Sequence, residues 1–334
     1  MANQRVIEVC DVQPTCRRRP SGQRSNAQKA SANRASDLRV TRMQPHSGGY
    51  EVCFERQGGK EAGRQGEERV TARAVFLAAG SLGTTELLLR CRDLEKTLPD
   101  LSPRLGQSWS ANGDFFAGLL GARIPIAPTE GPSVAAGYEA PEGFYTLEGA
   151  IPALLVERRR RWLRLLEALL APRRWLHGAP AAAAPARACS DPETEKLLRH
   201  LGAFFLMGRD AADGKLRLDA RGALDLDWDP RGSELLLDRM RRYLRELGRG
   251  YGGWMIVPER WWARGLSTVH PLGGCPMGRD PSEGVCDPFG RVFGYENLFI
   301  CDGSLFPCAL GFPPSMTIAA LAEHVVEKAV ASNG

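Results

Sequence analysis

The chain has 334 residues, of which 43% are hydrophobic and 25% charged, and its formal net charge is +5. These figures are typical of a soluble globular protein with one large domain or two ordinary ones. They give no argument for a nucleic-acid-binding protein, and no apolar run reaches the roughly 18 residues that a membrane-spanning helix needs.

Nine cysteines are spaced irregularly, and none of them belongs to a Cys-x-x-Cys pair. The odd count and the spacing argue against a zinc site and favour reduced thiols over a disulfide framework. The first residues, MANQRVIEVCDV, contain no apolar core of signal-peptide length. We therefore expect no metal and a cytoplasmic location.

The N-terminal part of the chain changes from irregular sequence to ordered α/β patterning. Residues 1–35 are rich in Arg, Ser, Ala and Asn without an apolar period, which predicts disorder. From Leu38, the alternation in LRVTRMQPHSGGYEVCFER predicts a β-hairpin around HSGG. The apolar run 74–79 then predicts a strand covered on both faces, followed by a GSLG turn and a helix. Such a turn presents backbone N–H groups to a phosphate or a carbonyl, although GSLG alone is a weak signal.

The middle of the chain, residues 121–265, has a mixed α+β pattern. LLVERRRRWLRLLEALL predicts a helix whose run Arg158–Arg161 either contacts lipid or nucleic acid or forms a solvated face, and the solvated face is favoured. Residues 179–188 are a Pro/Ala linker or exposed loop. KLRL and LDLD predict two short strands, and SELLLDRMRRYLRELGRGYGG predicts a helix that ends at glycines.

The C-terminal part contains a short buried strand, 298–301, with Asp302 and Gly303 at its carboxyl end. Ligands of open α/β sheets bind at this end of the strands, and an Asp-Gly pair lets the backbone approach a ligand closely. A simple N-cap or Asx turn is an equally good interpretation of the pair. A helix is predicted over 316–330.

One of the five histidines, His270, stands directly before a proline and a glycine-rich turn in STVHPLGGCPMG. It either begins a tight structural turn or is a proton-transfer residue held beside a cofactor. An imidazole titrates near neutral pH, which suits it to take a proton from a hydroxyl group.

Several motifs together resemble a known family. HPLGGCPMG, GRVFGYENLFICDGSLFP and TIAALAE resemble the C-terminal signature of the glucose–methanol–choline (GMC) flavoprotein oxidoreductases. VFLAAGSLGTTELLLR, WSANGD and FFLMGRDAADGKLRLD follow the order of the cholesterol-oxidase branch. The resemblance implies an α/β fold in which a partial FAD-binding, Rossmann-like domain (36–120 and 266–334) carries a β-sheet substrate-binding domain (121–265).

The resemblance also implies a function in steroid or other lipid metabolism. The family passes a hydride from an alcohol CH–OH group to FAD, which O₂ or another acceptor reoxidises. For this chain it implies a hydrophobic alcohol, such as a sterol, as substrate. His270 corresponds to the histidine that binds or deprotonates the hydroxyl group. Glu148, in YTLEGAIPALL, matches a glutamate of the substrate loop, with an ordinary loop carboxylate as the alternative.

The cofactor contacts that the resemblance implies are spread along the chain. Val40 corresponds to a residue beside the adenine. The others lie near the flavin or its phosphates, and they are Gly80, Asn112, Asp302 and Gly303.

Two departures from the family pattern are important. Pro313 stands where cholesterol oxidases have an asparagine that supports the hydroxyl site, and proline offers no polar side chain. No GxGxxG motif is present, so the unit that anchors the FAD pyrophosphate is missing. A fragment, a second polypeptide that supplies the unit and a decayed paralogue are the three explanations, of which we favour the first.

The missing unit leaves two functions open. The chain is either part of an FAD-dependent alcohol oxidoreductase or a truncated, non-catalytic remnant that binds an apolar ligand or a partner. Nucleic-acid binding is not expected. The basic Leu/Trp helix around Arg158–Arg161 is suited to peripheral contact with a bilayer, where a sterol would be found.

Overall fold

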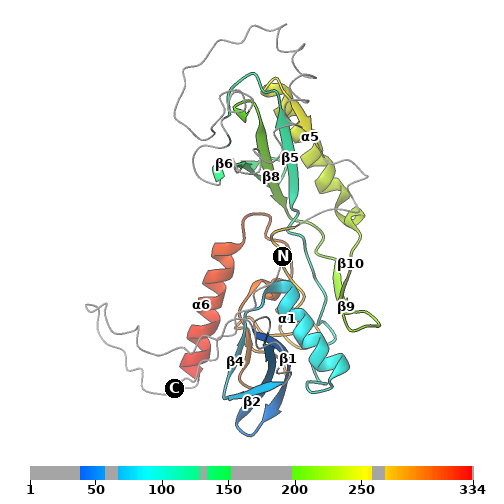
Figure 1. Ribbon diagram of the computed structural model, residues 1–334, viewed down its shortest axis with the longest axis vertical. Helices are drawn as coiled ribbons and strands as arrows, with labels where there is room; N and C mark the ends of the chain where they lie inside the picture. Colours follow the sequence, from blue (N-terminus) through cyan, green and yellow to red (C-terminus); the bar gives the residue numbers. More distant parts are fainter. Residues whose placement is uncertain are drawn as a thin grey trace, which may run out of the picture.

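The computed structural model describes residues 38–56, 67–126, 128, 134–151, 198–257 and 268–332. The predicted disordered segment, the helix around Arg158–Arg161 and the Pro/Ala linker lie outside these ranges. Figure 1 shows two lobes, with α1, α6 and strands β1, β2 and β4 in the lower lobe and α5, β5, β6 and β8 in the upper lobe.

The lower lobe begins with a three-stranded antiparallel sheet of order β1-β2-β3. Strands β1 (Leu38–His46) and β2 (Gly49–Arg56) form the predicted hairpin, and β3 (Glu68–Ala72) pairs with β2. The turn includes Gly48, whose φ of 75° explains why a glycine is needed there. The hairpin prediction is therefore confirmed.

A pair of parallel strands forms the centre of the lower lobe. Strand β4 (Val75–Leu77) pairs with β12 (Leu298–Ile300), and helix α1 (Gly80–Leu89), extended by the π-turn Arg90–Leu94, follows β4. The strand and the helix confirm the sequence prediction. Val75 and Phe76, which point to opposite faces of β4, are half-buried and pack against the core, so each face is partly covered.

The upper lobe is a five-stranded antiparallel sheet with one helix on one face. The strand order is β11-β5-β8-β7-β6, and helix α5 (Glu234–Gly250) packs on the sheet. The strands are β5 (Phe115–Leu120), β6 (Val134–Ala140), β7 (Phe144–Gly149), β8 (Gly202–Gly208) and β11 (Trp254–Ile256). Alternate strand residues, such as Phe115 and Leu206, pack with Leu237, Met240 and Leu244 of α5 into a core. The period of two in the strands and the helical spacing in α5 produce this core.

Residues 209–229 pack on the lower lobe, although their sequence lies within the segment predicted as the substrate-binding domain. They contain the predicted hairpin of β9 (Lys215–Leu218) and β10 (Leu224–Asp227), and Leu216 is buried in the lower core. Conversely, β5 belongs to the upper sheet. The chain therefore crosses between lobes just before Phe115, rather than at residue 120.

Helix α6 (Ser315–Ser332) confirms the predicted C-terminal helix. Its buried residues include Val325 and Ala329, whereas Met316 is 81% exposed. Short 3-10 turns lie at Pro230–Ser233 and Gly303–Leu305. Within the described ranges, no helix combines the length and the apolar character required to cross a membrane.

Candidate active site

The side chain of His270 forms a pair with a buried carboxylate. Nδ1 of His270 lies 3.0 Å from Oδ1 of Asp114, which is the residue before β5. The carboxylate of Asp114 is fully buried, whereas the imidazole is 17% exposed. An ionised carboxylate accepts and cannot donate, so the neutral imidazole carries its proton on Nδ1. Nε2 of His270 therefore presents a lone pair.

The second oxygen of Asp114 fixes the backbone that precedes the imidazole. Oδ2 accepts hydrogen bonds from Oγ1 of Thr268 at 2.8 Å, from the N–H of Val269 at 2.9 Å and from the N–H of His270 at 3.2 Å. One carboxylate thus holds both the ring and the main chain that carries it. Such an arrangement sets the direction of the imidazole as well as its tautomer.

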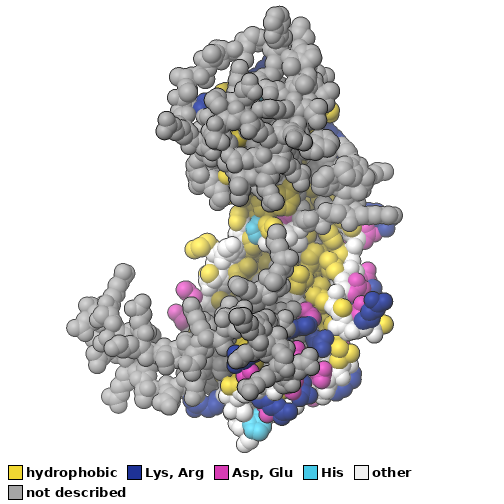
Figure 2. All heavy atoms as spheres, in the orientation of Figure 1, with side chains coloured by type: hydrophobic (Ala, Val, Ile, Leu, Met, Phe, Trp, Pro, Cys, Tyr) yellow, Lys and Arg dark blue, Asp and Glu magenta, His cyan; other side chains and the backbone are white. Residues whose placement is uncertain are grey.

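Aromatic rings extend from His270 across one face of the upper sheet. The ring of Phe205, on β8, stacks on the imidazole at 5.3 Å between centroids and 23° between planes. Phe116, on β5, stacks on Phe205 at 4.4 Å and is 43% exposed. The exposed residues Trp254 and Ile256 of β11 are register partners of β5 residues. Figure 2 shows hydrophobic side chains gathered at the waist between the lobes.

Asp302 caps the first turn of α1. Its Oδ2 accepts from the N–H of Gly80 at 2.9 Å and from Oγ1 of Thr84 at 2.5 Å, and its Oδ1 accepts from the N–H and the hydroxyl of Ser304 at 2.8 and 2.6 Å. The structure therefore gives the Asp-Gly pair the capping role. The carboxylate also occupies the helix terminus where the GSLG turn was expected to present N–H groups to a phosphate.

Gly303 lies close to the His270 segment. Its carbonyl accepts from the N–H of Gly273 at 2.9 Å, and a Cβ on Gly303 would lie 3.4 Å from Leu272 and 3.5 Å from the carbonyl of Pro271. The loop of His270 therefore packs directly against Gly303. Gly80 differs, because a Cβ there would meet no atom within 4 Å.

Asn112 is a fully buried residue with a positive φ of 55°. Its Oδ1 accepts from the N–H groups of Leu310 and Gly311 at 3.1 and 2.8 Å, and its Nδ2 donates to the carbonyl of Phe312 at 3.0 Å. The amide therefore joins the WSANGD segment to the loop that leads to Pro313. These bonds occupy the side chain that was expected to contact the flavin.

Glu148 does not join this cluster. It lies within strand β7, not in a loop, and its register partner on β8 is Phe204, which packs against Tyr251 at 5.9 Å on the α5 side. His270 stacks on the next residue, Phe205, which points to the opposite face. The structure therefore places Glu148 and the ring that stacks on His270 on opposite faces of the upper sheet. Burial, and secondarily the charge of Glu148, raises the pKa of Tyr251.

Val40 also lies apart from the histidine. It stands at the bulge of β1, half-buried against the core of the lower lobe. The structure thus brings the segment after His270 together with Gly303, joins Asp302 to Gly80, and places Asn112 in the turn that precedes Asp114. Asp114 is the residue that the sequence interpretation missed. Its only local signal is its position after WSANG and before an apolar strand, and this signal does not identify its partner.

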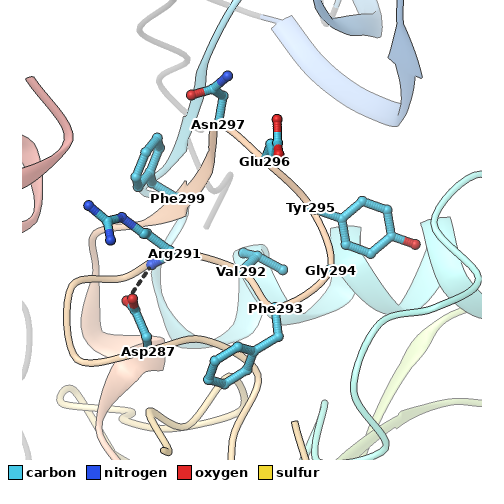
Figure 3. Close-up of a pocket in the computed structure, with 9 residues that line it drawn as sticks. All are labelled: Asp287, Arg291, Val292, Phe293, Gly294, Tyr295, Glu296, Asn297 and Phe299. Carbon is cyan, nitrogen blue, oxygen red and sulfur yellow. Dashed lines mark hydrogen bonds between the residues drawn. The ribbon is translucent and has the colours of Figure 1, made fainter. Parts of the chain in front are cut away.

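A separate hollow of about 880 Å³ opens beside β12 (Figure 3). Oδ1 of Asp287 accepts from the N–H of Arg291 at its rim, at 2.9 Å. The lining comprises Asp287, Arg291, Val292, Phe293, Gly294, Tyr295, Glu296, Asn297 and Phe299. None of the predicted site residues lies in this lining, so the hollow is distinct from the site around His270.

Comparisons with known proteins agree with this picture. Residues 257–322 match the family model described as GMC oxidoreductase. A cholesterol oxidase of Mycobacterium tuberculosis is 26% identical over 293 residues, which cover 78% of this chain and 47% of the relative. A cholesterol oxidase of Acinetobacter baumannii is 48% identical over 59 residues, which cover 18% and 11%. A long-chain-alcohol oxidase of Arabidopsis thaliana is 39% identical over 95 residues, which cover 28% and 12%.

Solved structures show the same fold. Pyridoxine 4-oxidase from Mesorbium loti matches with a TM-score of 0.56 and 20% identity, over 87% of this chain and 57% of that one. A fungal aryl-alcohol oxidase matches with a TM-score of 0.52 and 18% identity, over 88% and 60%. The chain spans about half the length, 47%, of the first curated relatives that it matches. Residues 257–322 thus match the GMC oxidoreductase family model, and the chain as a whole is similar to cholesterol oxidases.

Proposed function

We propose that this chain is part of an FAD-dependent oxidoreductase that oxidises the CH–OH group of a hydrophobic alcohol, with Nε2 of His270 as the proton acceptor. The cholesterol oxidase and alcohol oxidase relatives support flavin-dependent alcohol oxidation. The observation that carries the assignment of His270 is its pairing with the buried Asp114 beside an apolar sheet face.

The proposed chemistry assigns different tasks to the two paired residues. Nε2 of His270 takes the proton of the substrate hydroxyl as the C–H bond breaks. Asp114 keeps the other ring proton on Nδ1 and stabilises the imidazolium that forms. A flavin, when bound, supplies the hydride acceptor, and O₂ or another acceptor would reoxidise it. A positioned general base of this kind contributes about 10²–10⁴-fold to a rate.

The residues around His270 fit the substrate side of a flavin better than its phosphate side. Gly80 has open space where a side chain would stand, and Gly303 permits close packing by the loop of His270. At the start of α1, however, the N–H of Gly80 is bonded to Asp302, and the Asn112 amide bonds to the loop 310–312. We therefore propose that the pyrophosphate is held by a segment outside the described residues.

The sheet face beside the histidine supports an apolar substrate. Phe116, Trp254 and Ile256 are 43%, 61% and 49% exposed on this face, which favours an apolar substrate body. A sterol fits this description, as does another bulky hydrophobic alcohol. Pro313, in the loop held by Asn112, provides no polar side chain for the hydroxyl group.

The remnant hypothesis keeps one observation in its favour, because the N–H of Gly80, which the GSLG turn could have offered to a phosphate or a carbonyl, is bonded to a carboxylate of the chain itself. The two functions are separated by anaerobic addition of cholesterol and long-chain alcohols to the FAD-loaded protein. Bleaching of the visible flavin absorbance is expected for the oxidoreductase, with a strong loss in His270→Gln. His324→Gln, on the exposed surface of α6, is the matched control. An unchanged rate in His270→Gln would remove the proposed base.

A further inference from the structure

Asp210 is a half-buried carboxylate in the loop after β8 that forms part of none of the proposed chemistry. Its Oδ1 accepts from the hydroxyl of Ser110 at 2.7 Å and from the N–H of Ala212 at 3.1 Å, and its Oδ2 accepts from the N–H groups of Ala111 and Gly113 at 2.9 and 3.1 Å. Burial raises the pKa of Asp210, against the lowering effect of these hydrogen bonds. Three of the four bonds reach the turn 110–113.

This turn has a backbone conformation that needs support. Asn112 and Gly113 have successive positive φ angles of 55° and 60°, and a residue other than glycine is strained in that region. The N–H of Asn112 also donates to the hydroxyl of Ser110, at 2.8 Å, and that hydroxyl donates to Asp210. Asp210 therefore holds the turn at both of its ends.

The same turn determines where Asp114 lies. The carbonyl of Ala111 accepts from the N–H of Asp114 at 3.2 Å and lies 3.0 Å from Oγ1 of Thr268, whose single proton is within reach of this carbonyl and of the Asp114 carboxylate. Thr268 is also bonded to the carboxylate of Asp114 and to the N–H of His270. A change in the turn would therefore move the carboxylate relative to the imidazole.

We propose that Asp210 is a positioning residue for His270, which it serves through the turn 110–113 and the carboxylate of Asp114. This inference rests on the proposed role of His270 as the base. Asp210 keeps the proton of the neutral imidazole on Nδ1 and leaves Nε2 free to accept one. The carboxylate of Asp210 thus determines the orientation of Nε2 of His270 without contacting the imidazole.

The test is the tautomer of His270, measured by NMR on isotope-labelled imidazole nitrogens in the complete chain at a pH where the ring is neutral. The signal is identified by its loss in His270→Gln. The wild-type protein is expected to show the Nδ1-protonated form. Asp114→Asn gives the reference for a lost partner, and Asp210→Asn is expected to reproduce at least half of that shift towards Nε2 protonation. Asp213→Asn, an exposed carboxylate of the same loop, is the matched control and is expected to keep the wild-type tautomer.

A wild-type tautomer in folded Asp210→Asn would overturn the proposal, and so would an equal shift in Asp213→Asn. If Asp210→Asn does not fold, Ser110→Ala decides the question, because it removes one of the four bonds to Asp210 together with the bond from the Asn112 N–H, and it should shift the tautomer in the same direction. An unchanged tautomer in folded Ser110→Ala would then overturn the proposal. The measurement needs neither FAD nor alcohol, so its result is independent of whether the proposed oxidation occurs.

Discussion

The buried carboxylate of Asp114 and the partly exposed imidazole of His270 form a hydrogen-bonded pair at 3.0 Å, although 156 positions of sequence separate them. The pair joins the start of the upper sheet to the segment that returns the chain to the lower lobe. The orientation of the imidazole is therefore a property of the contact between the two lobes, and its chemistry depends on that contact.

Replacement of Asp114 by asparagine is expected to lower kcat for alcohol oxidation by about 10²–10⁴-fold in the FAD-loaded protein. The amide no longer stabilises an imidazolium, and it can donate to Nδ1 and leave the ring proton on Nε2. KM should change much less, because the apolar face that binds the substrate is intact. Steady-state kinetics of Asp114→Asn beside Asp213→Asn measure the effect. Equal kcat values for the two variants would contradict it.

Thr84 is the buried link between α1 and Asp302. Its hydroxyl donates to Oδ2 of Asp302 at 2.5 Å and accepts from the N–H of Ala79 at 3.1 Å. Thr84→Val keeps the shape, removes the acceptor of the Ala79 N–H and removes one of the two hydrogen bonds to Oδ2 of Asp302, so the free energy of unfolding should fall by about 1–3 kcal/mol. Urea unfolding measures this loss, with Thr71→Val on the exposed edge of β3 as the control. A stability equal to that of Thr71→Val would show that the cap contributes little.

Two glycines with similar backbone angles allow a matched comparison. Gly273, after His270, has a φ of 76°, and a Cβ there would collide with the carbonyl of Ser108. Gly143, in the β6–β7 turn, has a φ of 87° and open space around it. Gly143→Ala should cost only the left-handed strain of about 1–2 kcal/mol. Gly273→Ala should cost more, and equal unfolding midpoints would contradict the close packing of the HPLGG turn.

The thiols of the chain should differ strongly in reactivity. Burial raises the pKa of Cys275 to about 12, so this thiol remains protonated at neutral and mildly alkaline pH. Cys308 is exposed in the loop before α6. Treatment of the folded protein with iodoacetamide at pH about 8, followed by peptide mass spectrometry, should label Cys308 and spare Cys275. Labelling of Cys275 before denaturation would show that the HPLGGC turn opens.

Much of the secondary structure could be predicted because its signals are local. The alternation around HSGG gave the first hairpin, and the apolar spacing of residues 234–250 gave α5. The segments that cover β4 could not be predicted, because an apolar run shows that a strand avoids water but not which segment packs on it. The position of residues 209–229 on the lower lobe depends on tertiary contacts that periodicity does not report.

The candidate site was predictable only in part. His270 and Gly303 were found through motifs, and the structure places their segments together. Asp114 was missed, because nothing in its neighbours identifies a partner 156 positions away. Glu148 was assigned through one short motif. Its register partner is Phe204, whereas His270 stacks on Phe205, and these two neighbours on β8 point to opposite faces of the sheet. A motif does not show which face a strand residue points to.

The parallel pair of β4 and β12 has a practical consequence for handling the protein. β4 is paired along one edge only within the described ranges, beside the half-buried ring of Phe76. Such an edge is a template onto which a strand of another molecule can add. Concentrated samples are therefore expected to self-associate at this edge, which light scattering would detect. Ala78→Lys, at an exposed position next to the strand, should reduce this self-association.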